Sequence, residues 1–393
     1  MDAARFARSP VGQVVEVDVP APDGIVRLSA FVPAPLPDSF ELASATWHTV
    51  IEAARQIGSL DTLTRDLLSD PTLIAGLAIR REAISTSALE GTYAPVVDVL
   101  QSEALPRRPR SAAVTEILNF IEAANHGVGR LETLPVCTRL ACELHDLLVA
   151  GTPSEDYQRG QLRQTQVVIG LQGPASVADA RFIPPPAGDA LVQGVDDWER
   201  WLHRDNEVHP LIRIAASHYQ FETLHPFTDG NGRIGRLLAV LQLMESRLLS
   251  APVINLSPYF EIRRDEYFAS LEEVSATGAW DQWISLFCTA LGSQAQESSQ
   301  RIRALLDWRD QTVARLQEQS LTGAVIDMVP HLLGTPMVTA TEVARLLDVS
   351  APTAYSVLRR LVEHGVLEET TGGTYGRTYQ APQIIDILFR RSH

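Results

Sequence analysis

A polar run of twelve residues, lying between two stretches with helical apolar spacing, most constrains how this chain can fold. It reads His225-Pro226-Phe227-Thr228-Asp229-Gly230-Asn231-Gly232-Arg233-Ile234-Gly235-Arg236. On both sides apolar side chains recur three or four residues apart, as on one face of an amphipathic helix. They are Leu211, Ile214, Ala215 and Phe221 before the run, and Ile234, Leu237, Leu238, Leu241 and Met244 in its last part and after it. The chain must therefore bend tightly between two helices, with its polar groups gathered at the bend.

The glycines and arginines of the run predict a phosphate site. Gly230 and Gly232 flank Asn231, and because glycine tolerates a positive φ, successive backbone N–H groups can turn inward around an anion. The second helix begins there, and its dipole also favours negative charge. Arg233 and Arg236 share one face of its first turn, where two positive charges oppose the dipole. A bound polyanion removes that conflict.

Two other side chains of the run add chemistry to this site. A neutral imidazole at His225, beside a phosphate, can accept the proton of an attacking hydroxyl. Asp229 is a hard oxygen ligand, suited to Mg²⁺ whose remaining positions are filled by phosphate oxygens. A purely structural loop with surface arginines is the alternative interpretation, and the full spacing of the run favours a functional site.

The run resembles the Fic signature, HxFx(D/E)GNGRxxR, and matches it at every defined position. The resemblance implies transfer of AMP from ATP to a Ser, Thr or Tyr hydroxyl of a target protein. It assigns His225 as the catalytic base and Asp229 as the Mg²⁺ ligand, with Phe227 anchoring the loop in the core. The implied phosphate ligands are Gly230, Asn231, Gly232, Arg233 and Arg236.

A second segment, Thr86-Ser87-Ala88-Leu89-Glu90-Gly91, resembles the inhibitory helix of the same family, (S/T)xxxE(G/N). Thr86 and Glu90 lie four residues apart, and Gly91 is placed to end a helix. A carboxylate at a helix C-terminus opposes the dipole and favours a cationic partner. The resemblance implies that Glu90 pairs with Arg236, which we expect to be bidentate, and blocks the γ-phosphate position. A solvated glutamate before a helix cap is the alternative.

A β-prone segment predicts a hairpin beside the site. Residues 166–170 are bounded by glycine and are followed, after a loop, by Phe182-Ile183-Pro184-Pro185-Pro186. These two segments resemble the flap of Fic proteins, which holds the target segment by strand addition. A structural hairpin is the alternative. The expected flap residues are Gln166, Val167, Val168, Ile169 and Gly170.

The last part of the chain, residues 321–393, predicts a winged helix. Two short helices with helix-turn-helix spacing are followed by two β-prone segments; these are residues 340–347, 352–364, 366–368 and 374–380. Arg359, Arg360 and Arg377 are the candidates for DNA contact. However, this part contains six arginines and seven acidic residues, a net charge of −1. DNA-binding domains usually carry a basic surface. Protein interaction or dimerisation is therefore favoured over DNA binding.

Composition limits the class of protein further. A net charge of −15 disfavours general binding to nucleic acid or anionic membranes. The sequence contains no lysine, so phosphate chemistry must use arginine, backbone and metal rather than a P-loop lysine. Residues 1–5 lack the apolar region of a signal peptide, and no apolar run is long enough to span a bilayer. We therefore expect a cytoplasmic protein.

The predicted fold is mainly α: a Fic-type helical core with a small β-hairpin flap and a C-terminal winged helix-turn-helix domain. The expected parts are residues 1–110 with an N-terminal arm and the inhibitory helix, 111–300 as Fic core, 301–320 as a linker helix, and 321–393 as the winged helix. The first 40 residues predict a short strand or hairpin, and His145 is expected on the polar face of its helix.

The expected function is Mg²⁺- and ATP-dependent protein AMPylation, autoinhibited by Glu90. The partner is a target protein with a Ser, Thr or Tyr hydroxyl, and a homodimer is compatible with the sequence. Three alternatives stay open: a nucleotide-sensing transcriptional regulator, a Fic enzyme with another donor, and one that removes AMP.

Overall fold

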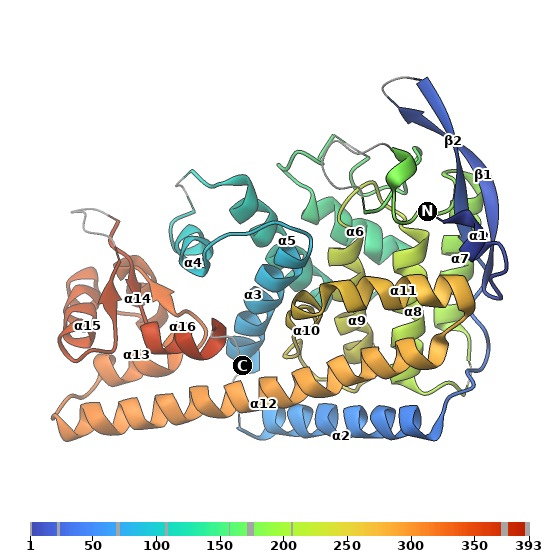
Figure 1. The fold of residues 1–393 in the computed structure, drawn as a ribbon. Helices are drawn as coiled ribbons and strands as arrows, with labels where there is room; N and C mark the ends of the chain where they lie inside the picture. The colour runs from blue at the N-terminus through green and yellow to red at the C-terminus, as the bar shows by residue number, and fades with distance from the viewer. Residues whose placement is uncertain are drawn as a thin grey trace.

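The computed structural model describes residues 2–21, 24–67, 71–106, 109–156, 158–170, 177–205, 207–370 and 376–389. This part of the chain is mainly helical (Figure 1). The helices are α1 (Ala3–Phe6), α2 (Ser44–Leu67), α3 (Pro71–Leu89), α4 (Val96–Ala104), α5 (Ala112–Arg130), α6 (Thr138–Leu148), η1 (Val177–Asp179), α7 (Asp189–His203), α8 (Pro210–Leu224), α9 (Asn231–Glu245), α10 (Ser257–Ile262), α11 (Arg264–Thr277), α12 (Trp280–Glu318), α13 (Ala324–Leu332), α14 (Ala340–Leu347), α15 (Ala351–Glu363) and α16 (Pro382–Phe389). The strands are β1 (Gly12–Ala21), β2 (Gly24–Pro33), β3 (Met337–Val338), β4 (Glu368–Glu369) and β5 (Tyr379–Gln380).

The two helices on either side of the polar run, α8 and α9, form the centre of the fold. Both are buried on nearly all faces, as expected of helices surrounded by other helices rather than by solvent. Pro210 occupies the first turn of α8, where its missing N–H is tolerated. α7 and α12 pack against α8, and α3, α5 and α6 pack against α9. The polar run is thereby held at one end of a rigid helix pair.

The N-terminal residues form a longer hairpin than the sequence predicted. β1 and β2 pair antiparallel over ten residues each, from Gly12 opposite Pro33 to Ala21 opposite Gly24. Figure 1 shows this hairpin standing at the edge of the molecule, beside α7 and α8.

Helix α12 runs for 39 residues and joins the two halves of the molecule. It lies along α2 in its first half and continues to the C-terminal helices α13 and α16 (Figure 1). The helix is continuous through residue 300, where the sequence analysis placed the end of the core. The last core helix and the linker helix are thus one element.

The C-terminal part has the predicted winged-helix arrangement. α14 and α15 lie close to the predicted residues, and β3, β5 and β4 form a small antiparallel sheet in that order. Thr339 and Glu342 form a reciprocal capping box at the start of α14, which satisfies its first backbone N–H groups. Residues 371–375, which include part of the predicted wing, lie outside the described residues.

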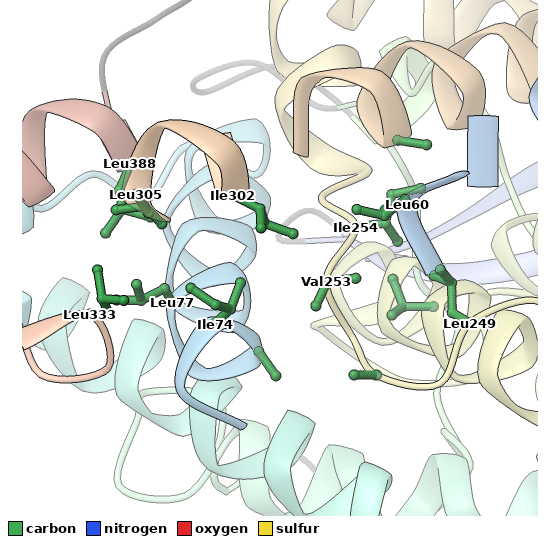
Figure 2. Close-up of a cluster of buried hydrophobic side chains, with 14 of the residues drawn as sticks. Leu60, Ile74, Leu77, Leu249, Val253, Ile254, Ile302, Leu305, Leu333 and Leu388 are labelled. Carbon is green, nitrogen blue, oxygen red and sulfur yellow. The ribbon is translucent and has the colours of Figure 1, made fainter. Parts of the chain in front are cut away.

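The winged helix is packed directly onto the rest of the chain. Figure 2 shows Ile74 and Leu77 of α3 next to Leu305 of α12, Leu333 after α13 and Leu388 of α16, within one continuous hydrophobic core. Across all the residues that the structure describes, none of the helices has both the length and the apolar character needed to cross a bilayer.

Candidate active site

The loop between α8 and α9 is held in shape by its own side chains. His225 ends α8 with φ 49°, and Gly230 precedes α9 with φ 75°. The side-chain amide of Asn231 accepts from the Phe227 N–H and donates to the Phe227 carbonyl, both at 2.8 Å. The side-chain amide of Asn231 is thus used to close the loop. Its backbone N–H, and not its side chain, is left to bind an anion.

A buried arginine that the sequence analysis did not assign, Arg163, supports the same loop. Its guanidinium donates to the carbonyls of His225 (2.9 Å), Pro185 (2.6 Å) and Leu224 (3.4 Å). Its backbone N–H donates to Pro226 O at 2.9 Å. Burial lowers the pKa of Arg163 to about 10, so it keeps its charge at neutral pH. Arg163 lies three residues before the expected flap, and only the fold shows that it contacts the loop between α8 and α9.

The tautomer of His225 follows from a contact with the backbone of α8. Its Nδ1 lies 3.3 Å from Glu222 O, and because a carbonyl can only accept, Nδ1 carries the proton. Nε2, which has no hydrogen-bond partner within the described residues, then holds the free lone pair. Burial, together with the Arg163 guanidinium, lowers the pKa of His225 to about 4. The imidazole is therefore neutral at physiological pH.

Asp229 is the half-exposed carboxylate of the loop, with 49% of its side chain accessible. It accepts from Ser154 Oγ at 2.6 Å and from the Gly230 N–H at 2.6 Å, and Arg233 lies 3.4 Å away. Burial acts against its charge, but the Arg233 guanidinium and these hydrogen bonds hold the pKa of Asp229 below its usual value. The described residues contain no cluster of three or more His, Cys, Asp or Glu that could hold a metal ion.

The two arginines of the run have different partners. Arg233 pairs with Glu116 of α5 at 2.9 Å, and Glu116 also accepts from the Thr92 hydroxyl at 3.0 Å. Arg236 is completely buried; its Nε donates to Thr86 Oγ1 at 2.8 Å and its Nη2 to Glu90 Oε1 at 2.6 Å. The expected bidentate pair between Glu90 and Arg236 is wrong, because Arg236 divides its donors between Thr86 and Glu90.

One donor of each arginine, Arg233 Nε and Arg236 Nη1, is buried and has no partner among the described residues. Burial disfavours the charge of Arg236, yet Glu90, Tyr267 and Glu222 raise the pKa of this guanidinium above its usual value. Buried donors without partners are costly, so both positions favour an additional anion.

Glu90 lies directly over Gly232, at the start of α9. A Cβ at position 232 would come within 2.2 Å of Glu90 Oε1, so only glycine leaves room for the carboxylate. Gly91, with φ 95°, ends the turn after α3, and Arg264 Nε donates to Leu89 O at 3.0 Å. These contacts hold the end of α3 over Gly232.

A cleft of about 320 Å³ brings these elements together. Its walls come from the end of α3, the flap, the end of α8, the start of α9 and α11; they include Glu90, Ile169, Gly170, Arg181, Phe182, Glu222, His225, Gly232, Arg264, Phe268 and Glu272. Burial raises the pKa of Glu222, which lines the cleft, to about 8. The apolar periodicity of the sequence did not indicate this carboxyl group.

The flap has less regular structure than predicted. The described part of the flap contains one antiparallel bridge, between Ile169 and Phe182, and no extended strand pair. Of the five expected flap residues, Ile169 and Gly170 line the cleft. Val168 packs against an apolar cluster outside it, and the Gln166 side chain donates to Val167 O and Pro184 O at 3.0 Å.

His145 was expected on a polar face, and this is wrong. The ring is buried and stacks on Phe227 with a centroid distance of 4.1 Å and an interplanar angle of 3°. Burial lowers the pKa of His145 to about 4. The sequence placed His145 between charged neighbours, but the loop packs over that face of α6 and excludes water from it.

Comparison with known proteins matches three parts of this chain to known families. Residues 135–243 match the Fic/DOC family, residues 47–129 the Fic/DOC family N-terminal region, and residues 332–371 the IclR helix-turn-helix domain.

Curated relatives match part of the chain. The protein adenylyltransferase Fic of Drosophila grimshawi is 31% identical over 118 residues, which cover 30% of this chain and 22% of that protein. The protein adenylyltransferase fic-1 of Caenorhabditis elegans is 35% identical over 120 residues, covering 30% and 20%. The chain thus spans about a fifth of the length of these relatives.

A solved structure shares the fold over most of the chain. The crystal structure of a Fic family protein from Desulfovibrio desulfuricans G20 is 20% identical, with a TM-score of 0.56, and covers 87% of this chain and 97% of that one.

Proposed function

The chain belongs to the Fic/DOC family, and from this we propose that it transfers AMP from ATP to a Ser, Thr or Tyr hydroxyl of a target protein. One observation carries the proposal: a single cleft holds the neutral His225 imidazole, the Gly232 backbone and Glu90, the partner of Arg236. Base and phosphate ligands therefore face the same space, whose volume lies at the lower end of the range for small-molecule sites.

In this proposal His225 acts as the general base. The target hydroxyl oxygen forms a bond to the α-phosphorus of ATP, its proton passes to His225 Nε2, and pyrophosphate leaves. A positioned base contributes about 10²–10⁴-fold to such a rate. The Nδ1 contact to Glu222 O keeps the lone pair on Nε2 throughout the approach of the hydroxyl.

The residues of the loop fit a triphosphate. The unpartnered donors Arg233 Nε and Arg236 Nη1, together with the backbone N–H groups at the start of α9, supply positive ends toward the anion. Mg²⁺ is usually held by one or two carboxylates plus substrate phosphates, and the half-exposed Asp229 supplies one such ligand. When bound, the metal would neutralise phosphate charge.

Autoinhibition by Glu90 is the second part of the proposal. Glu90 occupies the space over Gly232 and takes one donor of Arg236, so a γ-phosphate that uses Arg236 must displace it. Thr86 holds the Nε side of the same guanidinium. The flap residues 166–170 are proposed to hold the target segment by strand addition.

The test is incorporation of label from α-³²P-ATP into protein of a cell extract, with wild type, Glu90→Gly and Glu90→Gly/His225→Ala. The proposal expects strong labelling by Glu90→Gly alone. Labelling by the double variant at the level of Glu90→Gly would contradict it. Mass spectrometry of the labelled proteins then identifies the modified hydroxyl and distinguishes AMP from other donor groups and from AMP removal.

The second candidate is a nucleotide-sensing transcriptional regulator, favoured by the match of residues 332–371 to a helix-turn-helix domain. On the exposed face of this domain, Arg359 lies 3.7 Å from Glu363 and Arg377 lies 3.3 Å from Glu369. Because neighbouring carboxylates offset these positive charges, we propose protein contact rather than DNA contact for this face. A gel-shift assay with the full-length protein and duplex DNA decides between them.

A further inference from the structure

The N-terminal segment, residues 2–33, lies outside the ranges matched by the family models, yet it packs against the flap. Phe6 of α1 is buried between Phe31 of β2 and Phe182 of the flap, with ring centroids 5.6 Å and 5.9 Å away. Phe31 and Phe182 are 6.0 Å apart, so the three rings form one cluster. Ile169, the bridge partner of Phe182, packs against the same cluster.

The hairpin also contacts the flap through its backbone. The Phe31 N–H of β2 donates to Ile183 O at 2.9 Å, which attaches the returning flap segment to the edge of β2. A second apolar cluster joins Ala30 to Ala180 and Ile183, with Val168 at its border. The flap is therefore backed by β2, of which no described residue lines the cleft.

An ionic contact ties both segments to α11. Glu272 of α11 accepts from Arg181 Nε of the flap at 2.9 Å and also pairs with Arg5 of α1, which contacts Glu273 as well. Arg181 and Glu272 line the cleft that contains His225. A residue of the first helix thus contacts the same carboxylate as the flap arginine in the cleft wall.

We propose that the N-terminal segment is the support that holds the target-binding flap beside His225, with Phe6 and Arg5 as positioning residues. The inference rests on the proposed function, because it gives a role in target binding to the flap. The flap has one internal bridge among the described residues, and a strand pair of that size does not hold its own position in water. Its order must come from its neighbours, which are β2, α1 and α11.

The proposal separates target use from nucleotide binding. The phosphate ligands lie on α9 and its loop, and neither Phe6 nor Arg5 contacts them. Loss of the support should therefore loosen the flap and weaken transfer to protein, while ATP binds as before. One aromatic pair shifts a conformational equilibrium by up to about tenfold. The loss of two ring contacts should therefore raise the population with a displaced flap about tenfold or more.

The first measurement is amide hydrogen exchange at Ile169, whose N–H donates to Phe182 O at 2.8 Å. We expect about tenfold faster exchange in Phe6→Ala, partial recovery in Phe6→Leu, and a smaller increase in Arg5→Ala, which removes two partly exposed ion pairs. Leu36→Ala is the control for Phe6→Ala, because Leu36 is a buried residue just after β2 that packs on Trp201 and Ala216 and not on the flap. Arg27→Ala, which removes an exposed pair with Asp18 on the hairpin, is the control for Arg5→Ala.

The second measurement compares ATP affinity by calorimetry with labelling of extract proteins, each variant being made in the Glu90→Gly protein. We expect unchanged ATP affinity and about tenfold weaker labelling for Phe6→Ala, with both controls at the level of their parent. Unchanged Ile169 exchange in Phe6→Ala and Arg5→Ala would overturn the support, as would an equal increase in Leu36→Ala. If the Glu90→Gly parent itself transfers no AMP, the proposed function fails, and the exchange data still decide whether the N-terminal segment supports the flap.

Discussion

Replacing Glu90 with glycine should raise AMP transfer by about 10- to 30-fold. The Glu90–Arg236 contact is 2.6 Å long and joins a fully buried guanidinium to a carboxylate with 31% of its side chain exposed. A hydrogen bond to a charged group contributes about 1.5–3 kcal/mol. Solvent screening at the exposed carboxylate reduces this to roughly 1.4–2 kcal/mol. Since 1.4 kcal/mol corresponds to a factor of ten, loss of the contact should raise the population with a free Arg236 guanidinium by about 10- to 30-fold.

The assay is the initial rate of labelled-ATP incorporation by wild type and Glu90→Gly at equal protein concentration. Glu90→Gln is the matched control, because it keeps the size of the side chain and one oxygen acceptor but loses the charge; its activation should be smaller. Arg236→Ala should not activate, because it removes a phosphate ligand together with the partner of Glu90. Equal rates for wild type and Glu90→Gly would refute the reasoning.

The same substitution should also lower thermal stability in the absence of nucleotide. It removes the carboxylate partner of the buried Arg236, which costs about 1–3 kcal/mol. Mg-ATP should restore part of this loss, because a ligand that binds the folded state stabilises it. Differential scanning fluorimetry with and without Mg-ATP measures both effects, and a nucleotide-independent melting temperature would argue against a phosphate on Arg236.

Four further predictions concern His225 and Asp229. His225→Ala should lower transfer by about 10²–10⁴-fold while calorimetry shows ATP affinity largely intact, and near-normal transfer would exclude His225 as the base. The pKa of His225 is about 4 in the folded chain, so its neutral form should persist down to about pH 5 and the rate of transfer at saturating ATP should not fall at pH 6.5. For the same reason the unfolded chain binds more protons than the folded chain between about pH 6.5 and 4. The free energy of unfolding should therefore decrease as the pH falls through this range. Asp229→Ala should lose Mg²⁺-dependent activity, and unchanged Mg-ATP affinity with retained activity would contradict that assignment.

Local sequence was sufficient where one short segment carries all of the information. The spacing from His225 to Arg236 predicted a bend between two helices, because glycine positions and apolar periodicity depend only on neighbouring residues. The left-handed Gly230 and the start of α9 at Asn231 agree with it. The helix-turn-helix from 340 to 364 was predicted for the same reason.

Sequence pattern was insufficient where a residue's environment comes from distant segments. His145 has charged neighbours in sequence, but the loop that stacks Phe227 on it makes it a buried residue. In the sequence Arg163 looks like an ordinary charged residue, whereas in the fold it is buried against carbonyls at the end of α8. The flap was predicted from β-propensity, which reports a preference for extended backbone but does not say whether a partner strand is present.

The sequence by itself determined the chemistry available to this protein: a histidine, a carboxylate, two arginines and an anion-binding bend within twelve residues. Only the tertiary structure decided how that chemistry is arranged. Glu90 and Arg236 are separated by 146 positions in the chain, and their single contact exists because α3 packs against α9. Periodicity identifies which face of a helix is buried but not which helix covers it, since that choice depends on the summed packing of all the elements.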